Sequence, residues 1–326
     1  MRRRDFIALL AGAATGWAQL ARGQAKALPR VCLLTFDPQT MVATRFSGFF
    51  EGLRDLGYID GRTIAIDVLS VDGQAERYPA LATECLRRKA DVIVVTTTPG
   101  AQAAKNVTTA TPIVLIGLGD PVGTGLVDSL ARPSGNVTGL SQMAPELAAK
   151  RLALLREMAP QISRVLVLTY LADPIAPPQI RQLEAAAKGM GIQLLVQNIR
   201  TAEDLPAAFD AGTKGKAQGL VTTGESIFVV NRQRVVELAA RHKLPAVYPL
   251  RLVADAGGLM SYDSVRPDLH RRAATYVDKI LKGAKPAALP IEQPTKFELV
   301  ANLKTARDLA ITIPQSFLQR ADRVIQ

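Results

Sequence analysis

The sequence predicts an α/β protein in which two lobes are each built on a doubly wound parallel sheet. Its 326 residues exceed the size that a single hydrophobic core usually organises, so two lobes are expected. From residue 30 onward, short β-like runs alternate with helical patterns, which is typical of parallel α/β architecture. The alternation is repeated after Met143, and two sheets of similar size explain this duplication better than one very large sheet.

The first half of the chain contains five predicted strands, and the helices between them show regular apolar spacing. The strands cover residues 31–36, 64–70, 91–96, 112–117 and 136–140. In the first helix, apolar residues recur three or four positions apart and a glycine follows the last of them, which predicts a helix end. These residues are Phe46, Phe49, Phe50, Leu53 and Leu56, followed by Gly57. The next helix repeats the pattern with Tyr78, Leu81, Ala82, Cys85 and Leu86.

The second half repeats this organisation and then returns towards the first lobe. A predicted helix and five strands cover residues 145–158, 164–169, 192–198, 219–223, 245–248 and 258–262. They are followed by a helix over 268–282, a proline-rich stretch over 285–294, a strand near 297–300 and a helix from Pro314. Such a tail implies that the chain crosses between the lobes near residues 140–145, 262–267 and 289–294. The predicted lobes are residues 28–140 with 263–288, and residues 141–262 with 289–326.

Residues 1–25 have the organisation of an export signal. Three arginines precede an apolar stretch rich in alanine and glycine, and small residues follow it. The stretch is too short for a convincing membrane span, and the segment Arg3-Arg4-Asp5-Phe6-Ile7 resembles a twin-arginine signal. We expect cleavage between Ala21 and Ala27, which would leave a soluble periplasmic protein without a lipid anchor.

The distribution of charge argues against nucleic-acid binding. The formal net charge is +11, and the four arginines and one aspartate of residues 1–25 contribute +3 of it. The remaining basic residues are scattered over helices and do not form the clustered stripe that a nucleic acid requires. A basic surface would still help to attract an anionic ligand.

The two cysteines, Cys32 and Cys85, occupy apolar positions in a predicted strand and a predicted helix. Their number is too small for a disulfide framework, so we favour two buried thiols that act as small hydrophobic side chains. A structural disulfide is the alternative in an exported chain, because the sequence does not place the two sulfur atoms relative to each other.

The sequence gives little support for an enzyme. His242 and His270 each lie on a predicted helix beside arginine or lysine, so we expect both to be exposed to solvent. The sequence shows no Cys/His cluster with metal-ligand spacing, and neither a phosphate-binding P-loop nor a nucleophile elbow. We therefore expect no catalytic activity, no metal and no cofactor.

The predicted strands end in polar, turn-rich segments, which is where open parallel sheets bind ligands. Candidate ligand contacts at these ends are Thr35, Asp37, Thr97, Thr98, Asp120, Tyr170, Asp173, Glu225, Tyr248 and Leu250. Residues 98–101 open a helix whose free N–H groups could hold a carboxylate, but an ordinary cap by Thr97 or Thr98 explains the same residues.

Among the acidic candidates, three have an alternative explanation in turn chemistry. Asp37, Asp120 and Asp173 each precede a proline, and aspartate commonly forms turns there. Glu225 follows Gly224 at a strand end and is less well explained in this way. Its carboxylate would suit the ammonium group of a ligand.

Three segments resemble a known protein family. They are the stretch from Gly119-Asp-Pro-Val122 through residues 125–139, the segment 256–262 that ends at Tyr262, and the segment 293–304. All three are similar to motifs of one family of ABC-transporter substrate-binding proteins. That family includes tryptophan- and tyrosine-binding members with the type I periplasmic binding-protein fold. The resemblance implies two Rossmann-like lobes that are joined by three crossings, close on a ligand and dock on an inner-membrane permease.

The resemblance also implies roles for individual residues. In amino-acid-binding relatives, the helix start after the third strand takes the ligand carboxylate, and Thr98, Gly100 and Ala101 match it here. Glu225 matches the acidic residue that takes the amine, although relatives more often have aspartate there. Asp120 and Ser141 match rim positions of the first lobe, and Tyr262 is a further candidate contact.

Two departures from the family pattern affect the expected ligand. Residues 170–173 replace an asparagine-rich loop, and Leu250 stands where many relatives have an aromatic residue. Tyr170, Tyr248 and Leu250 could therefore line a pocket for an aromatic or branched ligand other than tryptophan or tyrosine.

The sequence thus predicts a monomeric periplasmic component of an ABC importer that captures a small carboxylate-bearing ligand, such as an aromatic or branched amino acid. The alternatives are a sugar or nucleoside ligand, and service to a sensor in place of a transporter. A sugar-responsive repressor shares the two-lobe fold but would need a helix-turn-helix at the N-terminus, where this chain has its export signal.

Overall fold

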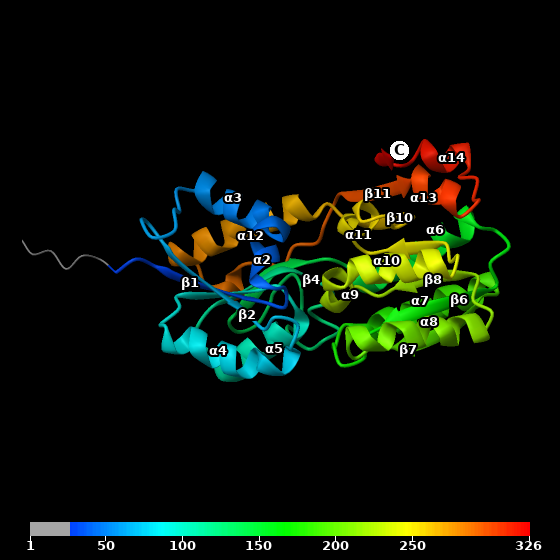
Figure 1. The fold of residues 1–326 in the computed structure, drawn as a ribbon. Helices are drawn as coiled ribbons and strands as arrows, with labels where there is room; N and C mark the ends of the chain where they lie inside the picture. The colour runs from blue at the N-terminus through cyan, green and yellow to red at the C-terminus, as the bar shows by residue number, and fades with distance from the viewer. Residues whose placement is uncertain (1–26) are drawn as a thin grey trace, which may run out of the picture.

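The computed structural model describes residues 27–326, which form two lobes, each with its own sheet (Figure 1). The first sheet has five parallel strands in the order β2-β1-β3-β4-β5. The second has seven strands in the order β12-β11-β10-β9-β8-β6-β7, and only β10 and β11 are antiparallel to each other. The predicted α/β class with two doubly wound parallel sheets is confirmed. The predicted export signal, residues 1–25, lies outside the described residues.

The first lobe begins with ten elements that follow one another in the chain. They are β1 (Arg30–Thr35), α2 (Gln39–Arg45), α3 (Ser47–Asp55), β2 (Ala65–Ser70), η1 (Ala75–Arg77), α4 (Tyr78–Arg87), β3 (Val92–Val95), α5 (Thr98–Val107), β4 (Ile113–Leu118) and β5 (Val137–Ser141). The chain then enters the second lobe.

The second lobe contains the next twelve elements. They are α6 (Ala144–Met158), β6 (Arg164–Thr169), α7 (Ala176–Met190), β7 (Gln193–Asn198), η2 (Ala202–Asp204), α8 (Leu205–Lys214), β8 (Gly219–Thr222), α9 (Ser226–Val230), α10 (Arg232–Arg241), β9 (Ala246–Tyr248), α11 (Arg251–Asp255) and β10 (Met260–Ser264). The last six elements are α12 (Arg266–Leu281), η3 (Pro286–Ala288), β11 (Phe297–Asn302), α13 (Leu303–Asp308), α14 (Gln315–Leu318) and β12 (Arg323–Ile325).

Both faces of the first sheet are covered by helices, which explains why its strands read as continuous apolar runs. Val31 and Leu33 point to one face and pack with α3 and α12, whereas Cys32 and Leu34 point to the other and pack with α4 and α5. Figure 1 shows these two helix pairs on opposite sides of the sheet. The predicted inward residues of α12 are all buried: Leu269, Ala273, Tyr276, Val277 and Ile280.

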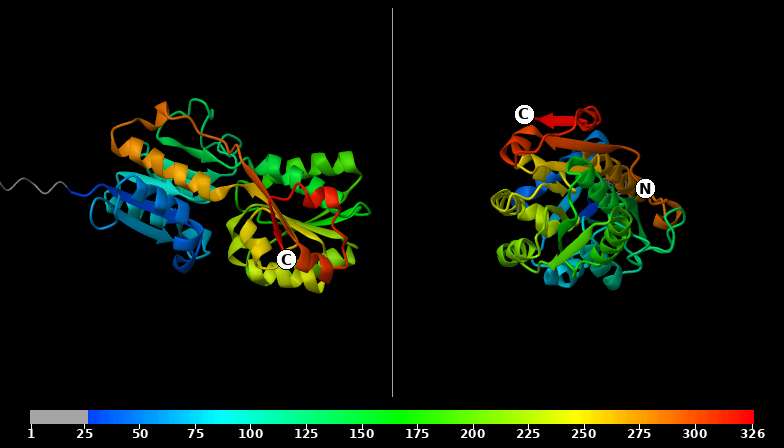
Figure 2. Two further views of the ribbon diagram at one scale, coloured as in Figure 1. Left: turned by 90° about the horizontal axis from the view of Figure 1, so that it is seen from above. Right: turned by 90° about the vertical axis from the view of Figure 1, so that its right-hand side faces the viewer.

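The chain passes between the two lobes three times, as the view from above shows (Figure 2). It leaves the first sheet after β5, returns after β10 and leaves again before β11. Helix α12 packs on α3 and β4 of the first lobe, although β10 and β11, which flank it in sequence, pair with each other in the second sheet. Neither lobe is therefore a continuous segment of the chain.

Several predicted elements differ from the observed ones at their boundaries. The predicted helix that carries Phe46 to Leu56 begins after Phe46, the residue that joins α3 to a separate helix α2, and Leu56 is 38% exposed because it lies past the last turn. The strand predicted at 258–262 lies two residues later as β10. The short edge strand β12 was not predicted, and its first two residues are exposed, so it lacks a clear apolar pattern.

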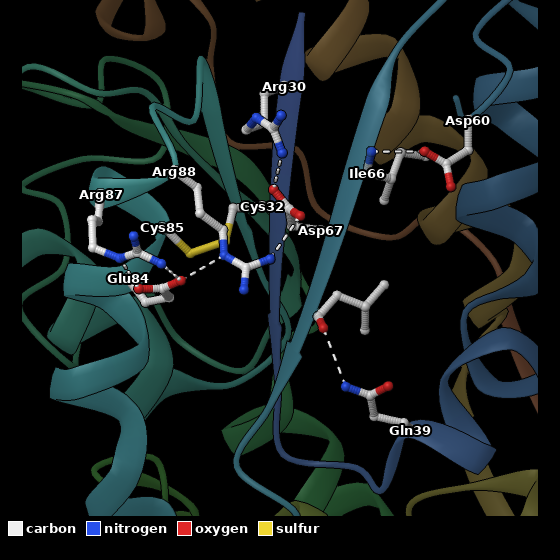
Figure 3. A network of polar contacts seen from close by, with 11 residues as sticks. Arg30, Cys32, Gln39, Asp60, Ile66, Asp67, Glu84, Cys85, Arg87 and Arg88 are labelled. Atoms are coloured by element: carbon white, nitrogen blue, oxygen red, sulfur yellow. Dashed lines mark hydrogen bonds and ion pairs between the residues drawn. A yellow bond between two sulfur atoms is a disulfide. The ribbon is translucent and has the colours of Figure 1, made fainter. Parts of the chain in front are cut away.

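Cys32 and Cys85 form a disulfide bond between β1 and α4 (Figure 3). The expectation of two separate thiols is therefore wrong. Cys32 points to the face of the sheet that α4 covers, and the two Cα atoms lie 5.7 Å apart, within the usual range for a disulfide. Beside the bond, Arg30 and Arg88 contact Asp67 of β2 with N–O distances of 2.6 and 2.8 Å.

The end of β4 shows why one glycine of the family-like motif is required. Gly139 of β5 has φ +133°, and a Cβ atom there would lie 2.4 Å from the Leu115 carbonyl oxygen. The register between β4 and β5 shifts after Leu115. This irregular pairing leads into residues 117–119 at the carboxyl edge of the sheet.

Candidate functional site

A cavity of about 40 Å³ lies between the lobes at the carboxyl ends of strands from both sheets. Thr98 and Gly119 line it from the first lobe, and Asp173 and Glu225 line it from the second. A second cavity of about 230 Å³ lies beside it, and Arg45 and Arg266 line both. A cavity of about 410 Å³ near residues 265–272 and 292–296 is lined by the start of α12 and the segment before β11, and none of the predicted ligand contacts lines it. The paired cavities are therefore the candidate site.

The lobes are in direct contact around this site. A Cβ atom on Gly119 of the first lobe would lie only 2.4 Å from the Ile175 side chain of the second. Arg45 Nη1 lies 3.5 Å from Ser226 Oγ across the same interface. One cluster of buried apolar side chains also continues from the first sheet to the second. The structure thus has the two rims closed against each other.

Glu225 lies at the N-terminal end of α9 and is 2% exposed. Its Oε1 accepts a hydrogen bond of 3.2 Å from Gln179 Nε2, and Oε2 accepts one from the Thr223 hydroxyl. Burial, with a smaller contribution from Asp173, raises the pKa of Glu225 to about 8. A carboxyl group of this kind becomes ionised at neutral pH when a cation is placed beside it.

Asp173 is the second buried carboxyl group in the cavity lining. It lies between β6 and α7, and its Oδ1 accepts a hydrogen bond of 3.1 Å from the Ile175 N–H. Burial raises the pKa of Asp173 to about 7, although the backbone hydrogen bond opposes this shift. Asp173 therefore combines the predicted turn role with a place in the site.

Arg45, at the C-terminal end of α2, is one of the two basic residues that both cavities share. It forms an ion pair with Asp37, whose side chain is fully buried. Its guanidinium also lies over the Phe46 ring, 5.3 Å from the ring centroid. Burial lowers the pKa of Arg45 against the opposing effect of Asp37. The first lobe thus presents to the cavity a fixed guanidinium that is paired with the Asp37 carboxylate.

A second buried arginine lies behind the site in α6. Arg151 is 1% exposed, and its Nη1 donates a hydrogen bond of 3.2 Å to the Tyr262 carbonyl oxygen. Burial lowers its pKa to about 10, and the nearby Asp263 opposes this shift. Arg151 does not line either cavity, so it acts on the site only through its charge.

The start of α5 offers fewer free backbone donors than the sequence led us to expect. Thr97 Oγ1 caps the helix by accepting a hydrogen bond of 3.2 Å from the Gly100 N–H. The Ala101 N–H donates to the Thr97 carbonyl oxygen at 3.0 Å, and Pro99 has no N–H. Thr98 therefore carries the remaining N–H near the cavity, which both Thr97 and Thr98 line.

The structure brings together five of the residues predicted to contact a ligand. Thr97, Thr98, Asp173 and Glu225 line the smaller cavity, and Leu250 lines the larger one. The remaining nine predicted residues line neither cavity: Thr35, Asp37, Gly100, Ala101, Asp120, Ser141, Tyr170, Tyr248 and Tyr262.

Most of those nine residues have a structural role. Asp120 Oδ1 accepts the Gly123 N–H at 2.8 Å, which is the turn role that was its alternative explanation. Ser141 Oγ lies 3.4 Å from the Gly119 carbonyl oxygen. Thr35 Oγ1 accepts the Asp37 N–H at 3.2 Å. These contacts shape the rim, while ligand contact by the same residues stays a prediction.

The two tyrosines of the predicted apolar pocket, Tyr170 and Tyr248, and the further candidate Tyr262 lie outside both cavities. Tyr248 is 1% exposed within the core of the second lobe. Tyr262 stacks on Phe297, with ring centroids 6.1 Å apart. Tyr170 is half-buried at the edge of a core cluster. The cavity lining is thus more polar than the sequence indicated.

His270 differs from the sequence-based expectation of a solvent-exposed side chain. It is 3% exposed and lies against Phe46, with ring centroids 5.1 Å apart. Burial and the nearby Arg266 lower its pKa to about 3. The expectation is wrong because the α12 face that carries His270 packs against the first lobe. Within residues 27–326, no group of three or more His, Cys, Asp or Glu side chains is arranged to hold a metal ion.

The sequence did not identify several residues that line the site, notably Arg45, Gln179 and Arg266. Each lies on or beside a helix, where a charged or amide side chain usually faces solvent. Their contacts are made with residues far away in sequence: Arg45 with Ser226, and Gln179 with Glu225. Asp37 lies eight residues before Arg45 and pairs with it. The presence of this acidic residue was the one sequence feature from which the ion pair could have been predicted. None of the helices in residues 27–326 is long and apolar enough to cross a membrane.

Comparisons with known proteins cover both lobes. A family model described as ABC transporter substrate binding protein matches residues 31–325. A tyrosine-binding protein of Clostridioides difficile (strain R20291) is 27% identical over 262 residues, which cover 80% of this chain and 75% of that protein.

Solved structures show the same likeness in three dimensions. An ABC domain from Streptococcus pneumoniae in complex with L-Trp has a TM-score of 0.85 and 25% identity, covering 92% of this chain and 100% of that one. A conserved domain protein from Vibrio cholerae has a TM-score of 0.86 and 26% identity, covering 91% and 99%. The shared fold is that of the type I periplasmic binding proteins.

Proposed function

The chain belongs to the family of ABC transporter substrate-binding proteins, and from this premise we propose that it is the exported ligand-capturing component of an importer. The proposed ligand is a small molecule with an ammonium and a carboxylate group, such as an aromatic or branched amino acid. Relatives named for tyrosine binding and solved with L-Trp support this class.

The observation that carries the proposal is the pair of buried carboxyl groups in the cavity between the lobes. Glu225 and Asp173 lie at strand ends of the second lobe and face Thr98 and Arg45 of the first. A carboxylate that is removed from water needs a cationic or hydrogen-bonding partner. The ammonium group of a ligand would supply it, and the first lobe would take the opposite end of the same molecule.

The proposed mechanism is capture by closure. A ligand that contacts both rims stabilises the closed arrangement of the lobes over the open one. The lobes that we propose to move are residues 28–140 with 263–288 and residues 141–262 with 289–326. The closed, monomeric protein would then present its surface to an inner-membrane permease.

The export signal that the sequence predicts in residues 1–25 supports a periplasmic location for this step, with the twin-arginine route as the proposed path. Binding and release require no bond to be made or broken. We therefore propose that the protein works without catalysis, metal or cofactor.

A thermal-shift and calorimetric screen over amino acids, aromatic acids, purines and sugars tests the proposal. We expect an amino acid to raise the melting temperature of the protein. The Glu225→Ala variant should bind this amino acid about 100-fold more weakly, because the ligand ammonium loses a buried charged partner. Thr213→Ala, at an exposed position of α8 that lines neither cavity, is the control. Stabilisation by sugars alone would overturn the ligand class.

Transport and sensing can be separated in cells. If the protein serves an importer, deletion of its gene should reduce uptake of the identified ligand. Unchanged uptake would favour a sensor.

A further inference from the structure

Arg45 is held in place before any ligand contact is considered. Its side chain is 7% exposed, and its ion pair with Asp37 anchors it within the first lobe. The Phe46 ring supports the guanidinium from one side. Ser226 Oγ, 3.5 Å from Nη1, contacts it from the second lobe. A guanidinium fixed on several sides loses little freedom when it binds a further group.

One hydrogen-bond donor of this fixed group is unused. Arg45 Nε is buried and has no hydrogen-bond partner among residues 27–326, and the same holds for Oδ2 of its ion-pair partner Asp37. The ion pair therefore does not use every donor of the guanidinium, and an unpaired buried donor is costly. Arg45 lines both cavities of the site, so a ligand carboxylate in either cavity would lie against its guanidinium.

The start of α5 does not compete strongly for the same ligand group. The Gly100 N–H is taken by Thr97 Oγ1, and the Ala101 N–H by the Thr97 carbonyl oxygen. Only the Thr98 N–H remains from this turn. A carboxylate accepts several hydrogen bonds, and a single backbone donor would leave it largely unpaired.

The carboxyl groups that line the smaller cavity, Asp173 and Glu225, belong to the second lobe, whereas Arg45 lines it from the first lobe. Asp37, the buried carboxylate of the first lobe, pairs with Arg45 and lines neither cavity. Ser226, which Arg45 contacts, directly follows Glu225 in the chain. The ammonium and carboxylate of one α-amino acid are separated by a single carbon atom, so they can face Glu225 and Arg45 at the same time.

We propose that Arg45 binds the carboxylate of the ligand and makes this carboxylate a condition of capture. The inference rests on the proposed function and narrows its ligand class to free α-amino acids. The corresponding amides, which keep the ammonium group and lose the negative charge, are rejected. Arg45 thereby determines specificity as well as joining the two lobes.

Calorimetry with matched acids and amides tests this role. The probes are L-tryptophan with L-tryptophanamide and L-leucine with L-leucinamide, measured on the wild type, Arg45→Gln and Arg45→Lys. We expect the wild type to prefer the acid by about 100-fold, as for the loss of one partner from a buried charge pair. Arg45→Gln should remove this preference, because it should lower the affinity for the acid while changing the affinity for the amide less than about 3-fold. Arg45→Lys should keep part of the preference, because it retains the charge and the Asp37 pair but lacks the guanidinium fork.

Arg232→Gln is the matched control. Arg232 reaches Met41 of the first lobe at 4.0 Å but lines neither cavity, so its loss should leave the acid preference unchanged. Melting temperatures establish that each variant is folded.

Equal weakening of acid and amide by Arg45→Gln would overturn the inference and reduce Arg45 to a contact between lobes. A wild type that binds acid and amide equally would overturn it as well. A wild type that binds neither amino acid would instead overturn the proposed function, and the role of Arg45 would fall with it.

Discussion

Glu225 and Asp173 place two carboxyl groups out of water at the same site. Their raised pKa values follow from burial first and, for Glu225, from the proximity of Asp173 second. Proteins keep such groups mainly where function uses them, because an apolar pair would fill the same space at lower cost. The two residues therefore connect ligand binding to proton exchange.

We expect capture of an amino acid to release a proton at pH 6.5. With a pKa of about 8, Glu225 is protonated at this pH, and the ligand ammonium favours its ionised form. Affinity should therefore rise between pH 6 and 8 by up to about 10-fold per pH unit. Calorimetry in buffers of different ionisation enthalpy measures the protons released. The Glu225→Gln variant should bind the amino acid more weakly and release almost no protons on binding. If it released as many protons as the wild type, the released proton would come from another group.

The two key residues of the site differ in how far the sequence could reveal them. Glu225 follows Gly224 at a strand end, where a turn explains it poorly, so local chemistry was sufficient. Arg45 lies on a short helix with no distinguishing pattern around it. Its burial depends on Asp37 and on Ser226, which is 181 residues away in sequence. Contacts of this range leave no signal in a single sequence.

At the scale of elements, the disulfide between β1 and α4 closes a segment of 53 residues. This segment contains α2, α3 and β2 and ends within α4. The bond therefore limits the freedom of this part of the first lobe in the unfolded chain.

We expect reduction of this bond to lower the free energy of unfolding by about 4 kcal/mol, from the loop-closure entropy of a segment of this size. Denaturant titrations of the oxidised and the reduced protein measure the change. Ligand affinity should stay the same, because both cysteines lie in the core and line neither cavity. Equal midpoints in the two titrations would contradict the prediction.

Strands and long helices were predictable because the burial of both sheet faces leaves continuous apolar runs. For the helix α12, five of the seven buried residues were predicted, and His270 and Ala274 were not among them. Short elements at the edges were not predictable in this way. The strand β12 has three residues, and two of them are exposed. It is therefore too short to show an alternation of apolar and polar side chains.

At the scale of the molecule, the lobes meet where Gly119 approaches Ile175. The duplicated α/β pattern predicted that two lobes exist. It could not predict how tightly they close, because closeness depends on individual small residues at the rim. Gly119 belongs to the family-like motif, and its contact gives that position a physical reason.

We expect Gly119→Val to weaken ligand binding by about 10-fold or more, since an overpacked contact costs about 1–3 kcal/mol and this one exists only when the lobes close. Calorimetry measures affinity, and small-angle scattering with ligand shows whether the lobes stay apart. Gly189→Val is the control, because a Cβ atom at Gly189 of α7 meets nothing within 4 Å. Equal affinities for the two variants would place the lobe contact elsewhere.

The return of α12 to the first lobe has a consequence for synthesis on the ribosome. Val31, Leu33 and Val94 share one core with Leu269 and Val277, so this face of the first sheet is only partly covered, by α3, until the chain has grown past residue 281. By then β6 to β10 of the second lobe have already emerged. The lobe that is translated first is thus completed late, and during that interval its apolar face is open to chaperones and to other nascent chains.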